Sequence, residues 1–189
     1  MEKLTLEPLT AAHGAELLAL WQDEAVVRYT NMALPCTPEE AERRADTLAR
    51  FDTFVLRLEG ELAGIAGCPA VDRAARRFGV FYQLRPAFWG RGLGMQAVGQ
   101  LLDFMAEKYG EVQLLAEVIT ENTASEKILQ HFQFTPCGEE PLERNGKHYT
   151  VRRYRKNLAP DAQSGEGNEH WRTAGSTDRP LPRRPQENS

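Results

Sequence analysis

A glycine-rich turn between a strand-like run and a helix is the part of the chain best suited to binding an anion. Gly90, Gly92 and Gly94 occupy alternate positions after the β-like run 79–84, and an amphipathic helical pattern follows directly. Glycine lacks Cβ, so the backbone can turn sharply there and approach a ligand closely. The first amides of a helix have no intrahelical partner and lie at the positive end of its dipole. The segment therefore predicts a phosphate-binding site.

The glycine-rich turn does not by itself identify the phosphate-containing ligand. A Walker A loop is excluded, because no Gly-x-x-x-x-Gly-Lys-Ser/Thr string occurs. Residues 92–97 fit the relaxed dinucleotide fingerprint Gly-x-Gly-x-x-Ala. That fingerprint normally belongs to the first strand–helix unit of a parallel sheet, whereas here several strand-like runs joined by a hairpin come first. A glycine turn that binds nothing is a third interpretation.

The same turn resembles motif A of the GNAT superfamily of acetyl-CoA-dependent N-acetyltransferases, Gln/Arg-x-x-Gly-x-Gly/Ala. Gly92 and Gly94 stand at its two small positions, and Trp89 stands where many members have Gln or Arg. Trp-Gly-x-Gly is typical of the branch that includes ribosomal-protein N-terminal (alanine/serine) acetyltransferases. Arg91 is predicted either to pair with a phosphate or to be solvated. The resemblance implies that the coenzyme contacts Gln83, Leu84, Trp89, Arg91, Gly92, Leu93, Gly94, Met95, Asn122 and Ser125.

A second motif follows the apolar run 114–119, which predicts a buried strand. Asn122 is a good helix N-cap, because its side-chain oxygen can accept an orphan amide. Asn122 and Ser125 also resemble the Asn-x-x-Ser mark of this GNAT branch. The helix is usually followed by Gly-Phe, but Gln133 replaces the glycine here. With similar patterns in the N-terminal third, the resemblance covers roughly residues 4 to 155.

Acetyl transfer to an amine requires a base, a donor to the carbonyl oxygen and help for the leaving thiolate. Glu117 interrupts an apolar run, and desolvation there would make it a better proton acceptor near neutral pH. We predict it to be the base, directly or through water. The alternatives are a strand residue facing solvent and a structural ion pair.

The resemblance implies the remaining groups. GNAT enzymes splay their fourth and fifth strands and hold the pantetheine arm between them, which assigns the backbone amides near Gln83 and Leu84 to pantetheine. Their usual acid, a tyrosine, corresponds to Leu129 here. Ser125 is the predicted substitute, and Tyr82 is a reserve candidate. The loop 28–35 and the hairpin 145–149 are predicted to line the acceptor site.

The length of 189 residues predicts one domain with a substantial core. We expect an α/β (α+β) fold with a mixed, mostly antiparallel central sheet, flanked by helices and splayed between strands 78–84 and 112–118. The resemblance implies that residues 1–158 form the N-acetyltransferase domain. Residues 159–189 have few large apolar side chains, so we expect a disordered tail.

Net charge, hydrophobic pattern and cysteine spacing limit the classes of binding partner that we expect. A net charge of −4 does not indicate a nucleic-acid surface, and no signal peptide or transmembrane run suggests a membrane. The cysteines, Cys36, Cys68 and Cys137, are odd in number and far apart, which gives no zinc spacing and fits a reducing cytoplasm.

The predicted function is metal-free, acetyl-CoA-dependent N-acetyltransfer by direct attack of a primary amine, either a protein N-terminus or a small-molecule amine, by a monomer or homodimer. The alternatives are a catalytically weak acyl-CoA-binding regulator on the same fold and a nicotinamide-dinucleotide-binding enzyme.

Overall fold

Two twisted sheets form the frame of the protein, and a computed structural model describes residues 3–30, 32, 34–144 and 146–159. The expected tail lies, from residue 160 onward, outside the described residues. Sheet A is antiparallel and has the order β1 (Leu4–Pro8), β2 (Asp52–Leu58), β3 (Glu61–Cys68), β6 (Phe81–Leu84). Sheet B has the order β4 (Ala70–Asp72), β5 (Arg77–Gly79), β7 (Val112–Ile119), β9 (Lys147–Leu158), β8 (Thr135–Arg144), and only its β5–β7 pair is parallel.

The helices begin and end where local signals place them. At the start of α3, Thr37 accepts a hydrogen bond from the Glu40 amide (3.2 Å) and Pro38 takes the first helical position. Gly110 ends α4 with a positive φ of 67°. The α-helices are α1 (Gly14–Gln22), α2 (Glu24–Val27), α3 (Pro38–Leu48), α4 (Leu93–Tyr109) and α5 (Thr123–His131), and short 3₁₀ turns span Ala11–His13 (η1) and Pro86–Phe88 (η2).

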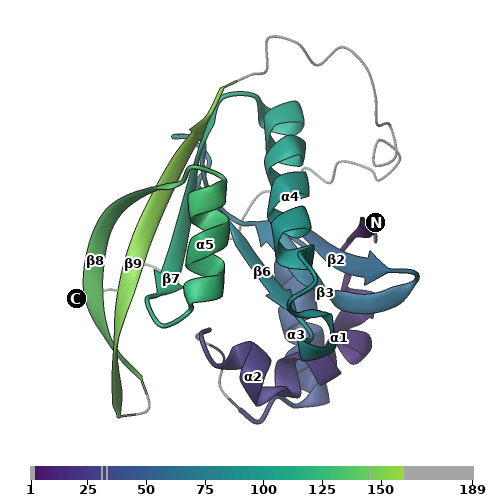
Figure 1. Cartoon of the computed structure of the whole chain (residues 1–189). Helices are drawn as coiled ribbons and strands as arrows, with labels where there is room; N and C mark the ends of the chain where they lie inside the picture. The colour runs from purple at the N-terminus through teal and green to yellow at the C-terminus, as the bar shows by residue number, and fades with distance from the viewer. Residues whose placement is uncertain (1–2, 31, 33, 145, 160–189) are drawn as a thin grey trace, which may run out of the picture.

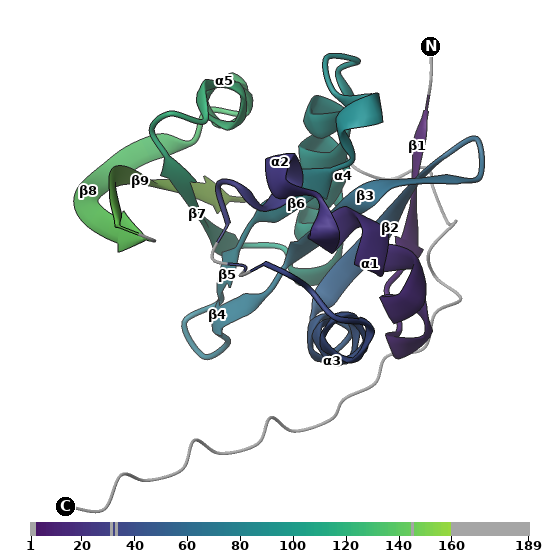
Figure 2. The same ribbon diagram turned by 90° about the horizontal axis from the view of Figure 1, so that it is seen from below.

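Sheet A is buried on both faces. Along β2, Phe54 and Leu56 belong to the core that includes α4, whereas Val55 between them belongs to the core that includes α1 and α3. This alternation follows from the period of two in a strand. Figure 2 shows α4 on one side of sheet A and α1 with α3 on the other. The helices therefore hold sheet A in the middle layer.

The segment from Arg77 to Leu84 changes sheets at Val80. Before it, β5 pairs in parallel with β7; after it, β6 pairs with β3. The Val80 amide donates to the Leu115 carbonyl (2.8 Å), and beyond that point β6 and β7 diverge (Figure 1). The splay of the two strands is thus confirmed, but the single strand expected over 78–84 is two strands, because each half pairs with a different neighbour.

Helix α5 is held by its own ends and by β9. The Phe134 amide donates to Leu129 and the Gln133 amide to Gln130, both at 2.9 Å, with Gln133 at a φ of +58°. This is a Schellman ending, so the turn expected of glycine forms with a non-glycine residue. From β9, Arg152 Nη1 contacts the Glu126 carboxylate at 2.6 Å.

Strand β8 is the outer strand of sheet B, and its residues are largely exposed. It contains Pro136 and Pro141, which have no backbone N–H to donate.

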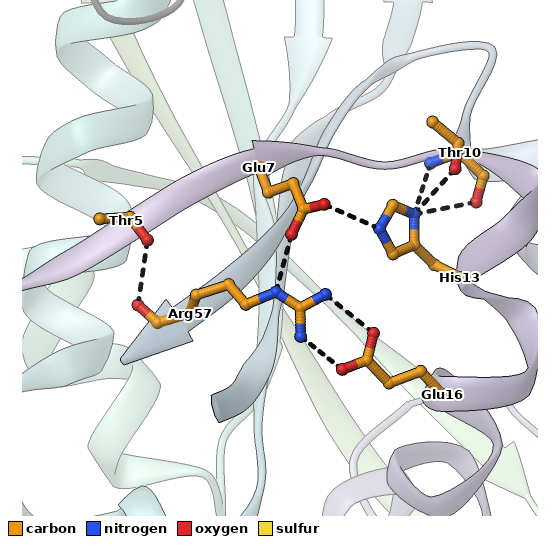
Figure 3. Close-up of polar contacts among 6 residues, drawn as sticks. All are labelled: Thr5, Glu7, Thr10, His13, Glu16 and Arg57. Atoms are coloured by element: carbon orange, nitrogen blue, oxygen red, sulfur yellow. Dashed lines mark hydrogen bonds and ion pairs between the residues drawn. The ribbon is translucent and has the colours of Figure 1, made fainter. Parts of the chain in front are cut away.

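Arg57 joins β2 to β1 and to α1 through carboxylates (Figure 3). Its Nε donates to Glu7 at 2.7 Å, its Nη2 donates to Glu16 at 2.9 Å, and its Nη1 donates to the other Glu16 oxygen. His13 Nε2 lies 3.2 Å from Glu7. All three guanidinium nitrogens of Arg57 therefore have a carboxylate partner.

Candidate active site

A cavity of about 1230 Å³ opens where β6 and β7 diverge. Its lining comes from both splayed strands, from the starts of α4 and α5, and from α1, α2 and α3. The cavity therefore extends from the glycine-rich turn to the N-terminal helices. One continuous space thus contains both a helix start that suits a phosphate and a second region formed by the N-terminal helices.

The glycine-rich turn places the first amides of α4 at this cavity. Gly90 and Gly92 have φ values of 72° and 73°, which L side chains rarely adopt. The Gln96 amide donates to the Gly92 carbonyl (3.1 Å). The preceding amides of Leu93, Gly94 and Met95 are the orphan donors of the helix start, and all three residues line the cavity. The strand, glycine turn and helix start thus have the arrangement that the sequence predicted, and the binding of a pyrophosphate to these amides stays a prediction.

Gly94 has a second role that the spacing did not reveal. A Cβ at this position would lie 2.9 Å from Ile128 Cδ1 and 3.1 Å from a ring carbon of Tyr82. The absence of a side chain therefore lets α4 pack closely against α5 and β6. We attribute the glycine to this packing rather than to open space kept for a ligand.

Trp89 and Arg91 flank the cradle differently. Trp89 is 49% exposed, lines the cavity and donates through Nε1 to the Leu84 carbonyl at 2.8 Å. The Arg91 guanidinium lies 5.3 Å from the centre of the Phe88 ring, and Arg91 is not among the residues that line the cavity. A phosphate contact by Arg91 remains a prediction.

Tyr82 and Ser125 come together although they are far apart in the sequence. The Tyr82 hydroxyl lies 2.9 Å from Ser125 Oγ, and both residues line the cavity. Burial raises the pKa of Tyr82, and the hydrogen bond with Ser125 partly opposes that rise. Asn122 Oδ1 accepts from the Ser125 amide at 3.2 Å, which confirms the predicted N-cap. The two candidate acids thus form one hydrogen-bonded pair.

The backbone of β6 corrects one expectation. A Cβ on Gly64 of β3 would lie 1.9 Å from the Gln83 carbonyl oxygen, and the Arg85 amide donates to Ala63 of β3 at 2.9 Å. Since polar groups alternate along an antiparallel strand, the Gln83 amide also faces β3. The prediction that the Gln83 amide faces the gap is wrong. The amides of Leu84 and Tyr82 have the opposite direction and face the gap.

Glu117 requires a second correction. It lies on β7 and lines the cavity, but its side chain is 64% exposed and its Oε1 lies 3.3 Å from Arg153 Nε on β9. The expectation of a desolvated carboxylate is wrong, because Arg153 is its direct cross-strand neighbour. The ion pair that the sequence offered as an alternative is present.

Residues from the N-terminal helices complete the lining. Trp21 Nε1 donates to the Gln83 side-chain oxygen at 3.0 Å, and Gln83 Nε2 contacts Met32 Sδ at 3.4 Å. Tyr29 and Met32 of the loop 28–35 line the cavity, and no described residue of the hairpin 145–149 does; the role of either segment in binding the acceptor stays a prediction. Arg43 and Arg44 of α3 also line it. Sequence reasoning missed these arginines because two charges on an exposed helix pattern look like ordinary surface residues.

Three general features of the described residues bear on function. Within them, no group of three or more His, Cys, Asp and Glu side chains is gathered as metal ligands are. No helix in these parts of the chain has the length and apolar content needed to cross a membrane. The strand before α4, β6, is antiparallel to its neighbour, so α4 does not follow a parallel strand as the dinucleotide fingerprint requires.

Comparison with known proteins gives consistent results. Residues 3–135 match the sequence model of the family described as Acetyltransferase (GNAT) domain. The chain is 26% identical over 146 residues to the uncharacterized N-acetyltransferase p20 of Bacillus licheniformis, covering 72% of this chain and 82% of that protein. It is 25% identical over 141 residues to FsC-acetyl coenzyme A-N(2)-transacetylase of Aspergillus fumigatus, covering 67% of this chain and 60% of that protein.

Solved structures share the fold. RimL, a ribosomal L7/L12 alpha-N-protein acetyltransferase in complex with coenzyme A, matches with a TM-score of 0.73 at 18% identity, covering 84% of this chain and 96% of that chain. The spermidine N-acetyltransferase of Vibrio cholerae, in complex with CoA and spermine, matches with a TM-score of 0.74 at 17% identity, covering 83% and 96%.

Proposed function

Because the chain belongs to the GNAT family of acetyl-CoA-dependent N-acetyltransferases, we propose that it moves an acetyl group to a primary amine by direct attack of that amine. The observation that carries this proposal is the junction of two features in one cavity: the open edge of β6 and the orphan amides of α4. An extended molecule with an anionic end satisfies both features at once.

The residues present fit coenzyme A. The amides of Leu93, Gly94 and Met95 would hold its pyrophosphate, and the outward amides of Tyr82 and Leu84 would pair with its pantetheine arm. Asn122 and Ser125, which line the cavity at the start of α5, would border the same arm. Acetyl-CoA supplies the thioester whose acetyl group is transferred.

We assign the proton transfers to two places in the cavity. Glu117 takes a proton from the amine through a water molecule, since its carboxylate is solvated and ion-paired with Arg153. The Tyr82–Ser125 pair donates a proton to the leaving thiolate, because the buried phenol remains protonated at neutral pH. Ser125 is then the partner that orients the Tyr82 hydroxyl.

The acceptor is either a protein N-terminus or a small-molecule amine. The RimL match acts on a ribosomal protein, and the V. cholerae match on spermidine, so relatives with the same fold serve both classes. We expect a cytoplasmic protein, because its three cysteines are unpaired, acting as a monomer or homodimer.

Thiol release from acetyl-CoA in the presence of a panel of amines tests the function directly. Glu117→Gln should lower turnover by about a hundredfold, within the range for a general base, and leave acetyl-CoA binding unchanged in calorimetry. Glu121→Gln is the matched control, because Glu121 lines the same cavity outside β7. Acetyl-CoA binding without thiol release from any amine would instead support a non-catalytic acyl-CoA-binding regulator.

The acid pair has its own test. Tyr82→Phe and Ser125→Ala should each slow turnover, and the double variant should be little slower than Tyr82→Phe, since the two hydroxyls act as a unit. Full additivity of the two effects would contradict the proposal that Tyr82 and Ser125 act as a pair.

The nicotinamide-dinucleotide alternative is tested by binding. Tighter binding of NADH than of acetyl-CoA would contradict the family-based assignment altogether.

A further inference from the structure

Two adjacent guanidinium groups lie at the part of the cavity formed by the N-terminal helices. Arg43 and Arg44 follow one another on α3, and both line the cavity beside Trp21 and Tyr29. Arg44 is the more buried of the two, with 22% of its side chain exposed against 72% for Arg43. A partly buried cation at a cavity wall is a strong feature for a ligand to recognise.

The hydrogen-bonding capacity of Arg44 is only partly used among the described residues. A single carboxylate oxygen, Glu40 Oε1, lies 3.3 Å from Arg44 Nη2 and 3.6 Å from Arg43 Nη2. Arg44 Nη1 is buried and has no hydrogen-bond partner among the described residues. Leaving such a donor unpaired is costly, and most buried polar groups avoid it. Glu40 therefore contacts both cations, but Arg43 also lines a separate hollow with Glu39, Glu42 and Asp46, so the incomplete set of partners concerns Arg44.

The acidic residues in the cavity lining lie elsewhere. Glu117 is on β7 and pairs with Arg153, and Glu121 follows β7. The described lining thus has its acids near the splayed strands and its cations on α3. A molecule with an amine at one end and an anionic group at the other would match this separation of charge.

On the basis of the proposed function, we infer that the acceptor is an amine that also carries a carboxylate, and that Arg44, aided by Arg43, binds this carboxylate. The guanidinium fork matches the planar carboxylate, and the exposed part of the Arg44 side chain, with the more exposed Arg43 beside it in the sequence, is the part that a ligand in the cavity reaches. A polyamine would bring further positive charge to the two arginines and is disfavoured.

Paired acceptors test this assignment. β-Alanine, γ-aminobutyrate and ε-aminocaproate are each compared with the corresponding primary amide, together with the peptides Ala-Asp-Ala and Ala-Asn-Ala as C-terminal amides. For at least one pair, the carboxylate member should have a KM lower by about tenfold or more, as expected for a charge-assisted hydrogen bond. Equal KM values within every pair, or a preference for spermidine or phosphoethanolamine, would overturn the inference.

Variants of α3 identify the residue responsible. Arg44→Gln should abolish the carboxylate preference while kcat for the amide member stays the same, and Arg44→Lys should restore part of it. Arg50→Gln is the matched control, because Arg50 pairs with Asp46 and does not line the cavity. If Arg44→Gln raised KM equally for the carboxylate and the amide member of a pair, Arg44 would have a merely structural role, and the inference would be overturned.

Binding separates this inference from the proposed function. Calorimetric titration of the same compounds requires no acetyl transfer. A carboxylate preference in binding, with no thiol release from any amine, would support the Arg44 site and contradict the transferase function. Turnover of amines without any carboxylate preference would support the function and contradict the Arg44 site.

Discussion

Arg57 and Arg44 are nearly equal in exposure, at 19% and 22%, but differ in what they contact. Every guanidinium nitrogen of Arg57 has a carboxylate partner, supplied by Glu7 and Glu16. Among the described residues, Arg44 has one hydrogen-bond partner, Glu40, and one buried nitrogen without a partner. The region around Arg57 is complete without a ligand, whereas the region around Arg44 is not. We therefore expect changes in the first region to alter stability and changes in the second to alter ligand affinity.

The largest effect on stability should come from Arg57→Met. The change leaves Glu7 and Glu16 without their shared cation, and we expect a loss of about 2 kcal/mol in the free energy of unfolding. Urea denaturation measures this loss. The control Arg50→Met removes an exposed pair with Asp46 and should cost less than about 0.5 kcal/mol. A change in acceptor KM on Arg57→Met would break the contrast between the two regions.

Acid pH should remove the same stabilisation. Hydrogen bonds from Arg57 lower the pKa of both Glu7 and Glu16 from the ordinary value of 4.5. A lowered folded-state pKa gives stability that is present above the unfolded pKa and lost as pH falls through the folded one. The difference in Tm between the wild type and Arg57→Met should therefore shrink below about pH 4.5. A difference that stays constant from pH 7 to about pH 3 would contradict the assignment.

Gly94→Ala should affect both stability and turnover, because Gly94 lets α4 pack closely against α5 and β6 and also lines the cavity. The new Cβ meets Ile128 and the Tyr82 ring, so we expect a loss of about 1 kcal/mol and a turnover reduced about tenfold as the phenol is displaced. Thermal unfolding and thiol release measure the two effects. Gly99→Ala in the same helix is the control: its Cβ would meet only the Phe132 ring, at 3.3 Å or more, and we expect near-neutral stability and normal turnover.

The smallest effect should be a gain. Gln133 has a φ of +58° at the end of α5, where a side chain is strained and glycine is not. Gln133→Gly should raise the free energy of unfolding by about 0.5–1 kcal/mol and leave turnover unchanged. A loss of stability would show that the Gln133 side chain contributes more than its backbone strain costs.

The features that could be predicted from the sequence are those that depend on residues close together in the chain. The Asn122 cap and the glycine turn at Gly92 each depend on neighbours within a few residues, and the structure has both. The splay of strands was also predicted, because the resemblance to GNAT enzymes supplied it. Glycine at position 133 proved dispensable, because the Schellman hydrogen bonds form without it.

Contacts between distant segments could not be predicted in the same way. The direction of the Gln83 amide depends on the register of β6 against β3, and a shift of one residue reverses it. The exposure of Glu117 depends on Arg153 lying opposite it on β9. The Tyr82–Ser125 hydrogen bond likewise arises only after the sheets and helices pack, as does the lack of a partner for Arg44 Nη1 within the described part of the chain.

The two prolines of β8 have a consequence for contacts between copies of the protein. β8 is the outer strand of sheet B, and an unprotected outer strand invites a neighbouring molecule to extend the sheet. Pro136 and Pro141 interrupt the row of backbone N–H donors along this edge, which disfavours pairing with a strand of another molecule. The prolines thus disfavour pairing of β8 with a second copy of the protein, while the edge of β6 in the other sheet stays open toward the cavity.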